Sequence, residues 1–139
     1  MSRFVLDASV ALRWFLDDPV PEYAAHIRRL ILGGDRAVVP VIWTLEMVNS
    51  LVVAERKGNI TPVAVDERIS NIEELLDSYI DVQTVGISAR SALIVSRNSG
   101  LTAYDASYLD LAQSEKLPIA TLDAQLRKAA ARAGVDLVP

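Results

Sequence analysis

Short apolar runs alternate with longer stretches of helical periodicity along most of the chain. Five runs predict strands, at residues 4–6, 37–39, 82–87, 118–121 and 135–138. The stretches between them predict helices at 10–16, 22–32, 41–57, 61–79, 88–99, 102–115 and 123–132. A repeated strand-then-helix order is typical of an α/β fold, with a parallel sheet covered by helices. A length of 139 residues is typical of one compact domain, so we expect a single domain over residues 1–139.

Two predicted helices offer more apolar surface than one small sheet obviously covers. The helix at 41–53 is apolar almost all round. The helix at 61–79 begins at the capping pair Thr61–Pro62. Its apolar stripe consists of Val65, Ile69, Ile72, Leu76 and Tyr79. Because a large exposed apolar patch usually marks an interface, we expect these two helices to contact a partner. The alternative is that both stripes are buried against the sheet.

Composition narrows the class of protein. Hydrophobic residues make up 51% of the chain, which is typical of a globular protein. There is no cysteine, so disulfides and thiolate zinc sites are excluded. No apolar run is long enough to span a membrane, and the N-terminus lacks the pattern of a signal peptide, so we expect a cytoplasmic protein. The net charge of -4 argues against binding nucleic acid by bulk electrostatics, although a carboxylate site for a cation adds negative charge itself.

Four carboxylates stand out by their positions. Asp7 and Asp123 follow predicted strands, and Asp105 lies in the first turn of the helix that precedes the fourth strand. Ligands of open α/β sheets gather at the carboxyl ends of the strands, so these three can meet there. Glu46 lies in the apolar helix, where a carboxylate without a partner is costly. A bound cation would remove that cost, and an oxygen-only donor set favours Mg2+ or Mn2+.

Each carboxylate also has an ordinary structural explanation. Asp7 and Asp123 can be helix caps, and Asp105 can be a favourable charge at a helix N-terminus. Glu46 can be a paired or exposed helix residue. The metal-site hypothesis therefore depends on the four positions coinciding with one topology.

Four segments resemble the PIN domain, and most of all the VapC-type toxins of toxin–antitoxin pairs. These segments are "FVLDASVALRWFL" at 4–16, "WTLEMVNSL" around Glu46, "LTAYDASYLDLA" at 101–112 and "IATLDAQLRKAA" at 119–130. The resemblance spans nearly the whole chain. It implies a three-layer α/β/α fold with a short parallel sheet of four or five strands. It also implies an Mg2+- or Mn2+-dependent endoribonuclease, with an RNA substrate, an antitoxin protein as partner and a homodimeric state.

The resemblance also assigns residues. It implies that Asp7, Glu46, Asp105 and Asp123 are catalytic and hold the metal, with Ser9, Asn49 and Thr121 in support. Ser9 can instead be a helix N-cap, Thr121 can simply fill the strand end, and Asn49 can bond a loop backbone. The competing function is a non-catalytic PIN-like interaction module. A dinucleotide-binding protein is excluded because no Gly-x-Gly-x-x-Gly follows the first strand, and no suitably placed lysine supports a phosphoaspartyl protein.

The remaining polar and aromatic candidates have simpler explanations. We expect Asp110 to be a solvated surface residue and His26 to have no catalytic role. Arg13 can contact RNA phosphates but is more simply an exposed helix residue. Trp14 and Trp43 are expected in the core or at an interface.

Overall fold

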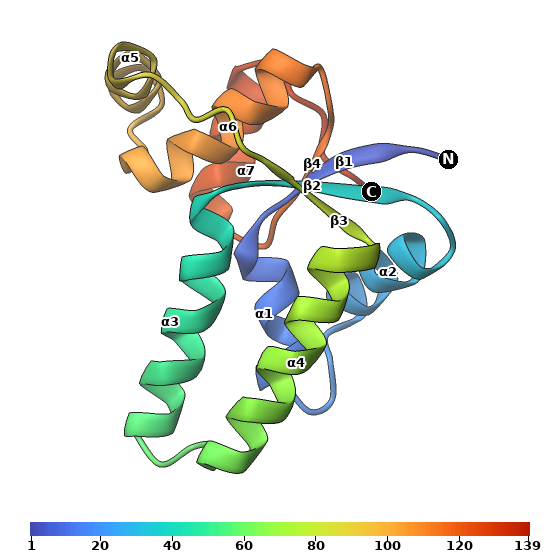
Figure 1. Cartoon of the computed structure of the whole chain (residues 1–139). Helices are drawn as coiled ribbons and strands as arrows, with labels where there is room; N and C mark the ends of the chain where they lie inside the picture. Colours follow the sequence, from blue (N-terminus) through green and yellow to red (C-terminus); the bar gives the residue numbers. More distant parts are fainter.

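The computed structural model describes residues 1–139 and consists of seven helices and four strands (Figure 1). In chain order these are β1 (Arg3–Leu6), α1 (Ala8–Leu16), α2 (Glu22–Leu32), β2 (Arg36–Pro40), α3 (Ile42–Arg56), α4 (Pro62–Ser78), β3 (Ile80–Gln83), α5 (Ala89–Ser99), α6 (Ala103–Glu115), β4 (Ile119–Ala120) and α7 (Ala124–Arg132). Every predicted helix is present. None of these helices is both long enough and apolar enough to cross a membrane.

The four strands form one parallel sheet in the order β3-β2-β1-β4. Val5 of β1 pairs with Val38 on one side and with Ile119 on the other, so β1 lies inside the sheet. Figure 1 shows α1, α3 and α4 below the strands and α5, α6 and α7 above them. The predicted three-layer α/β/α architecture with a four-stranded parallel sheet is therefore confirmed.

Two strand predictions are wrong. The strand expected at 82–87 is β3, which begins earlier and ends at Gln83, because its partner strand β2 ends at Pro40, opposite Gln83. Val85 lies beyond the sheet and is 80% exposed. The strand expected at 135–138 is reduced to one bridge between Leu137 and Ile119, since β4 has only two residues.

Side chains close to the helix ends define several helix starts. Thr61, Ser88 and Thr102 each accept a hydrogen bond from the backbone N–H three residues on. Gly100, with φ of 73°, ends α5 in the left-handed conformation that glycine tolerates. The cap that Thr102 provides matters most for the site. Its Oγ1 accepts a hydrogen bond from the backbone N–H of Asp105, a candidate site residue.

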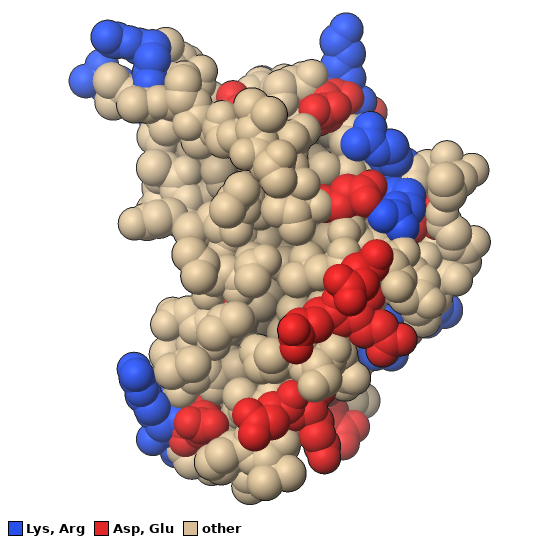
Figure 2. Space-filling view, viewed as in Figure 1, with Lys and Arg blue, Asp and Glu red and all other residues tan.

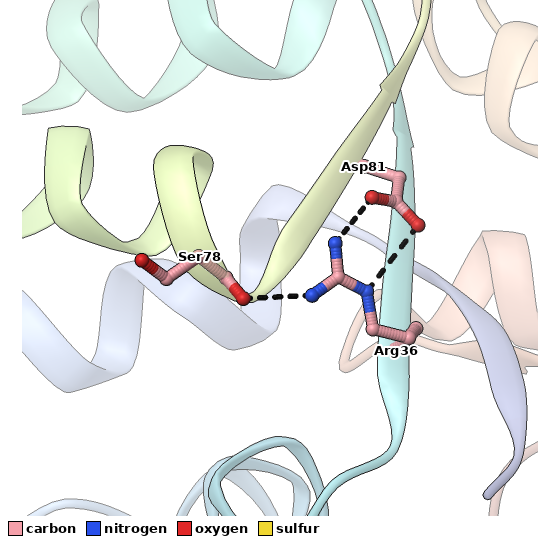
Figure 3. Close-up of polar contacts among 3 residues, drawn as sticks. All are labelled: Arg36, Ser78 and Asp81. Carbon is pink, nitrogen blue, oxygen red and sulfur yellow. Dashed lines mark hydrogen bonds and ion pairs between the residues drawn. The ribbon is translucent and has the colours of Figure 1, made fainter.

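The outer edge of the sheet is tied to α4 by one arginine (Figure 3). Arg36, at the start of β2, pairs with Asp81 of the edge strand β3. Its Nη1 also donates to the backbone carbonyl of Ser78, the last residue of α4, at 2.7 Å. A cation at the last carbonyl of a helix satisfies an unpaired acceptor and complements the helix dipole. This contact therefore holds α4, β3 and β2 together on the side of the sheet away from β4.

The two apolar helices are covered only in part. On α4, Val65 and Ile72 are buried. The other members of that stripe are half-buried. On α3, Leu45 remains 64% exposed. The outer face of α4 is acidic instead, and Figure 2 shows the red side chains gathered there. These exposed acidic residues of α4 are Asp66, Glu67, Glu73, Glu74 and Asp77.

Candidate active site

Asp7 lies directly after the buried strand β1 and is itself only 4% exposed. It occupies the N-cap position of α1, but its side chain makes no capping hydrogen bond. Its Oδ2 instead accepts hydrogen bonds from Ser9 Oγ at 2.6 Å and from Thr121 Oγ1 at 2.7 Å. Asp7 is therefore the N-cap of α1 by position, but its side chain does not cap the helix.

Ser9 and Thr121 form a compact hydroxyl network around Asp7. Thr121 is fully buried, and its Oγ1 accepts from the backbone N–H of Asp123 at 3.0 Å. Ser9 Oγ accepts from the backbone N–H of Leu122, also at 3.0 Å. Ser9 is consequently not the N-cap of α1, and Thr121 does more than fill the strand end. The network joins the end of β1 to the segment after β4 and leaves Asp7 Oδ1 outside these bonds.

Glu46 comes from α3 and is half-buried. Its Oε1 accepts a hydrogen bond from the hydroxyl of Tyr108 at 2.5 Å. Tyr108 lies on α6 and is fully buried. Burial raises the pKa of Glu46, the Tyr108 hydroxyl lowers it, and the charges of Asp7 and Asp105 raise it further. Burial and the neighbouring Glu46 carboxylate strongly raise the pKa of Tyr108, so its hydroxyl stays protonated and donates.

Asp105 and Asp123 complete the acidic set from two helix starts. Asp105 lies in the first turn of α6 and is half-buried. Asp123 does act as a helix cap, because its Oδ1 accepts from the backbone N–H of Leu126 at 2.9 Å. Burial raises the pKa of Asp105, and the charge of Asp123 raises it again, while the Thr102 hydroxyl lowers it.

Each of the four carboxylates lies close enough to repel at least two of the others. Burial is the main cause that raises the pKa of Asp7; the Ser9 and Thr121 hydroxyls oppose it, and the charges of Asp105 and Asp123 add to it. The structure therefore brings the carboxylate of Asp7, near the N-terminus, close to that of Asp123, near the C-terminus. It contains no group of three or more His, Cys, Asp or Glu side chains that could hold a metal ion as they stand.

An open pocket of about 410 Å³ lies beside two of the four carboxylates, and Asp7 and Asp123 are not part of its lining. Glu46 and Asp105 line it, together with the predicted supporting residue Asn49. Asn49 is exposed, and its amide makes no hydrogen bond to Glu46 or to a loop backbone, so its supporting role stays a prediction. Tyr104 also lines the pocket and is 64% exposed.

The remaining candidates lie outside this acidic set. Asp110 is half-buried rather than fully solvated, and burial raises its pKa; it lines a neighbouring pocket of about 620 Å³. Arg13 is half-buried and forms an ion pair with Asp17 at 2.8 Å. Trp43 is fully buried, as expected for a core residue. Trp14 is half-buried and donates to the carbonyl of Ala24.

Tyr108 is a residue of the site to which the sequence motifs did not point. A sequence signal existed, because Tyr108 lies three residues after Asp105 and hence on the same face of a predicted helix. A tyrosine among buried apolar neighbours also needs a partner for its hydroxyl. The identity of that partner, 62 residues away, is a property of the tertiary structure.

Comparisons with known proteins identify the family and the fold of the chain. The family model of the PIN domain matches residues 4–132. Among solved structures, PAE2754 from Pyrobaculum aerophilum has a TM-score of 0.69 at 24% identity, and the alignment covers 92% of this chain and 79% of that one. FitAcB from Neisseria gonorrhoeae has a TM-score of 0.68 at 18% identity, with 100% and 97% covered.

A third structure is VapBC2 from Rickettsia felis, bound to a DNA fragment from their promoter. It has a TM-score of 0.63 at 12% identity, and the alignment covers 99% of this chain and 98% of that one. At these identities the three structures share the fold with this chain. No curated protein matches the sequence.

Proposed function

The chain belongs to the PIN domain family, and we propose that it is a divalent-metal-dependent endoribonuclease, the toxin of a VapC-type toxin–antitoxin pair. The observation that carries the proposal is the environment of Asp7. This buried carboxylate is held on one oxygen by two hydroxyls and faces two further carboxylates, Asp105 and Asp123. Proteins rarely gather buried negative charge without a positive ligand.

The donor set suits a hard divalent cation. Asp7, Glu46, Asp105 and Asp123 offer only oxygen, and cysteine is absent. Mg2+ usually binds through one or two protein carboxylates and keeps several waters, so it does not require three carboxylates in direct contact. When bound, the cation would supply an acidified water and positive charge for a scissile phosphate. We propose Asp7 as the principal ligand, because its Oδ1 is outside the hydroxyl network.

The protein's own residues have distinct proposed roles. Ser9 and Thr121 orient Asp7, and the backbone N–H groups of Leu122 and Asp123 fix those two hydroxyls in turn. Outer hydrogen bonds of this kind keep a ligand oxygen in place before the cation arrives. Glu46 and Asp105 line the open pocket, where an RNA phosphate would approach.

The test is cleavage of RNA by the purified protein. A panel of transfer, ribosomal and messenger RNA is incubated with Mg2+, with Mn2+ and with EDTA. We expect divalent-dependent cleavage that leaves 5′-phosphate and 3′-hydroxyl ends, and no cleavage by Asp7→Asn. Cleavage that survives EDTA, or that Asp7→Asn retains, would contradict the proposal. A wild-type protein that cleaves none of the RNAs would favour the non-catalytic interaction module.

We also propose an antitoxin partner. The VapC-like motifs support this, and so does the fold shared with VapBC2 and FitAcB. A groove of about 500 Å³ lies between α4 and the α1–α2 pair; half of its lining is apolar, including Trp14 and Leu75, and the other half is polar or charged, including Arg28 and Glu74. A partner segment with an apolar face would fit such a groove. The test is co-purification with the product of the neighbouring gene, and a loss of cleavage when that protein is added.

The proposed homodimer would use a different surface. Leu45 of α3, Ile94 of α5 and Tyr104 of α6 are large and exposed. Leu45 and Tyr104 also line the open pocket beside Glu46, so the dimer contact would border that pocket. In Figure 2 the surface on the side of α3, below α5, is largely free of charge. An apolar, weakly charged surface of this kind is typical of an interface. Sedimentation at micromolar concentration tests the proposal, and a monomer would contradict it.

A further inference from the structure

The Tyr108 hydroxyl makes the only side-chain hydrogen bond to Glu46. Tyr108 is fully buried, and its hydroxyl lies 2.5 Å from Glu46 Oε1. We propose that Tyr108 is a positioning residue: it fixes the Glu46 carboxylate at the candidate metal site and leaves Oε2 for the cation. This inference rests on the proposed function and extends it to a residue outside the acidic set.

Glu46 needs such a fixed partner. Its side chain is long, lies at the wall of an open pocket and is half-buried. The negative charges of Asp7 and Asp105 act on it from within the site and favour its movement towards solvent. A hydrogen bond from a neutral donor to Oε1 opposes that movement without occupying the position of a cation.

Tyr108 is well suited to be that partner. Its ring is enclosed in the core of the protein, so the packing of α6 fixes the position of the hydroxyl. Asp105 lies three residues earlier on the same helix. Helix α6 therefore carries the Asp105 carboxylate and also the hydroxyl that orients Glu46. The Tyr108–Glu46 hydrogen bond connects α6 to α3 at the site. Partners that orient a metal ligand typically change metal affinity or activity by about tenfold to a hundredfold when removed.

The competing explanation is purely structural. A buried tyrosine needs an acceptor for its hydroxyl, and Glu46 could serve only that purpose. The two explanations differ in one measurable property. A positioning role affects the affinity for the cation, whereas a structural role affects only stability.

The experiment compares two Tyr→Phe variants of the full chain. Tyr108→Phe keeps the ring and removes the hydroxyl. Tyr23→Phe is the control, because the Tyr23 hydroxyl donates to the carbonyl of Val138 at 2.7 Å and to no carboxylate. The variant keeps the Tyr23 ring, and with it the contact with Arg127, whose guanidinium bonds the Thr121 carbonyl. Mn2+ affinity is measured by calorimetry without RNA, and thermal unfolding is followed in EDTA. We expect Tyr108→Phe to bind Mn2+ about tenfold to a hundredfold more weakly, and Tyr23→Phe to bind it as the wild type does.

A second comparison tests whether Tyr108 acts through Glu46. In a Glu46→Ala background the hydroxyl has no carboxylate to orient, so adding Tyr108→Phe should cause no further loss of Mn2+ affinity. Independent losses that multiply in the double variant would overturn the proposed route through Glu46.

The outcomes separate this inference from the proposed function. If the wild type binds Mn2+ and cleaves RNA, and Tyr108→Phe does both equally well, the positioning role is wrong and the nuclease remains. A Tyr108→Phe protein that fails to fold, while Tyr23→Phe folds, would also overturn it in favour of a structural role. A wild type that does not bind Mn2+ would refute the metal site and the role of Tyr108 together.

Discussion

Replacement of Asp7 by asparagine should stabilise the metal-free protein while removing its response to metal. The amide keeps the size of the carboxylate, and its oxygen can still accept the hydroxyls of Ser9 and Thr121. The substitution removes a negative charge that is 4% exposed and that Asp105 and Asp123 repel. The same charge is what a cation would bind, so the two effects have opposite signs.

The magnitudes follow from the burial of Asp7. Burial and like charges that raise a carboxyl pKa also destabilise the folded protein when the carboxyl group is ionised. The loss is about 1.4 kcal/mol for a tenfold change in the acid dissociation constant. For a chain of 139 residues, an unfolding entropy of about 2.1 cal/mol/K per residue converts that energy into about 5 °C. Binding of Mg2+ at a hundred times its dissociation constant would add about 2.7 kcal/mol to the wild type, or roughly 9 °C.

The assay is thermal unfolding at pH 7.5 in EDTA and then in a series of Mg2+ concentrations. We expect Asp7→Asn to have the higher Tm in EDTA and a Tm that Mg2+ does not change. Asp66→Asn is the control, because Asp66 is exposed on α4 and is not among the charges that raise the pKa of Asp7, Glu46 or Asp105; it should match the wild type in both conditions. An Asp7→Asn protein less stable than the wild type in EDTA, or still stabilised by Mg2+, would refute the reasoning.

Three further predictions concern the same structure. Folding raises the pKa of the Asp7 carboxyl above its ordinary value of 3.8. The folded state therefore binds the carboxyl proton more tightly than the unfolded chain does. The stability that this protonated carboxyl contributes is lost as the pH rises above 3.8 and through the raised pKa. In EDTA the Tm difference between Asp7→Asn and the wild type should therefore be small at pH 4 and grow towards pH 7.5; a constant difference would contradict it. Thr121→Val should cost about 1–3 kcal/mol in urea unfolding, because the N–H of Asp123 and one oxygen of Asp7 lose a buried partner, and it should also weaken Mn2+ binding; an unchanged protein would remove Thr121 from the site. Leu45→Lys should shift a dimer towards monomer in sedimentation without lowering Tm, since Leu45 is 64% exposed; an unaffected dimer would place the interface elsewhere.

Local signals in the sequence are reliable where the structure they specify is local. Thr61, Ser88 and Thr102 cap helices through bonds to residues only three positions away, so the sequence alone predicts these helix starts. The order of strands and helices is likewise visible in the apolar periodicity, and with it the α/β/α class. Asp7 and Asp123 could be placed at the carboxyl ends of strands for the same reason.

Several hydrogen bonds within the site join residues that are far apart in the sequence. Only the tertiary structure decides these partners. Ser9 and Thr121 meet at one oxygen of Asp7 because β4 pairs beside β1, more than a hundred residues away in sequence. Glu46 of α3 meets Tyr108 of α6 across 62 positions of the sequence. The strand expected at 82–87 ends early for a similar reason, since β2 offers no partner beyond Pro40. Periodicity reports which face of an element is buried, whereas hydrogen-bond partners depend on which elements pack together.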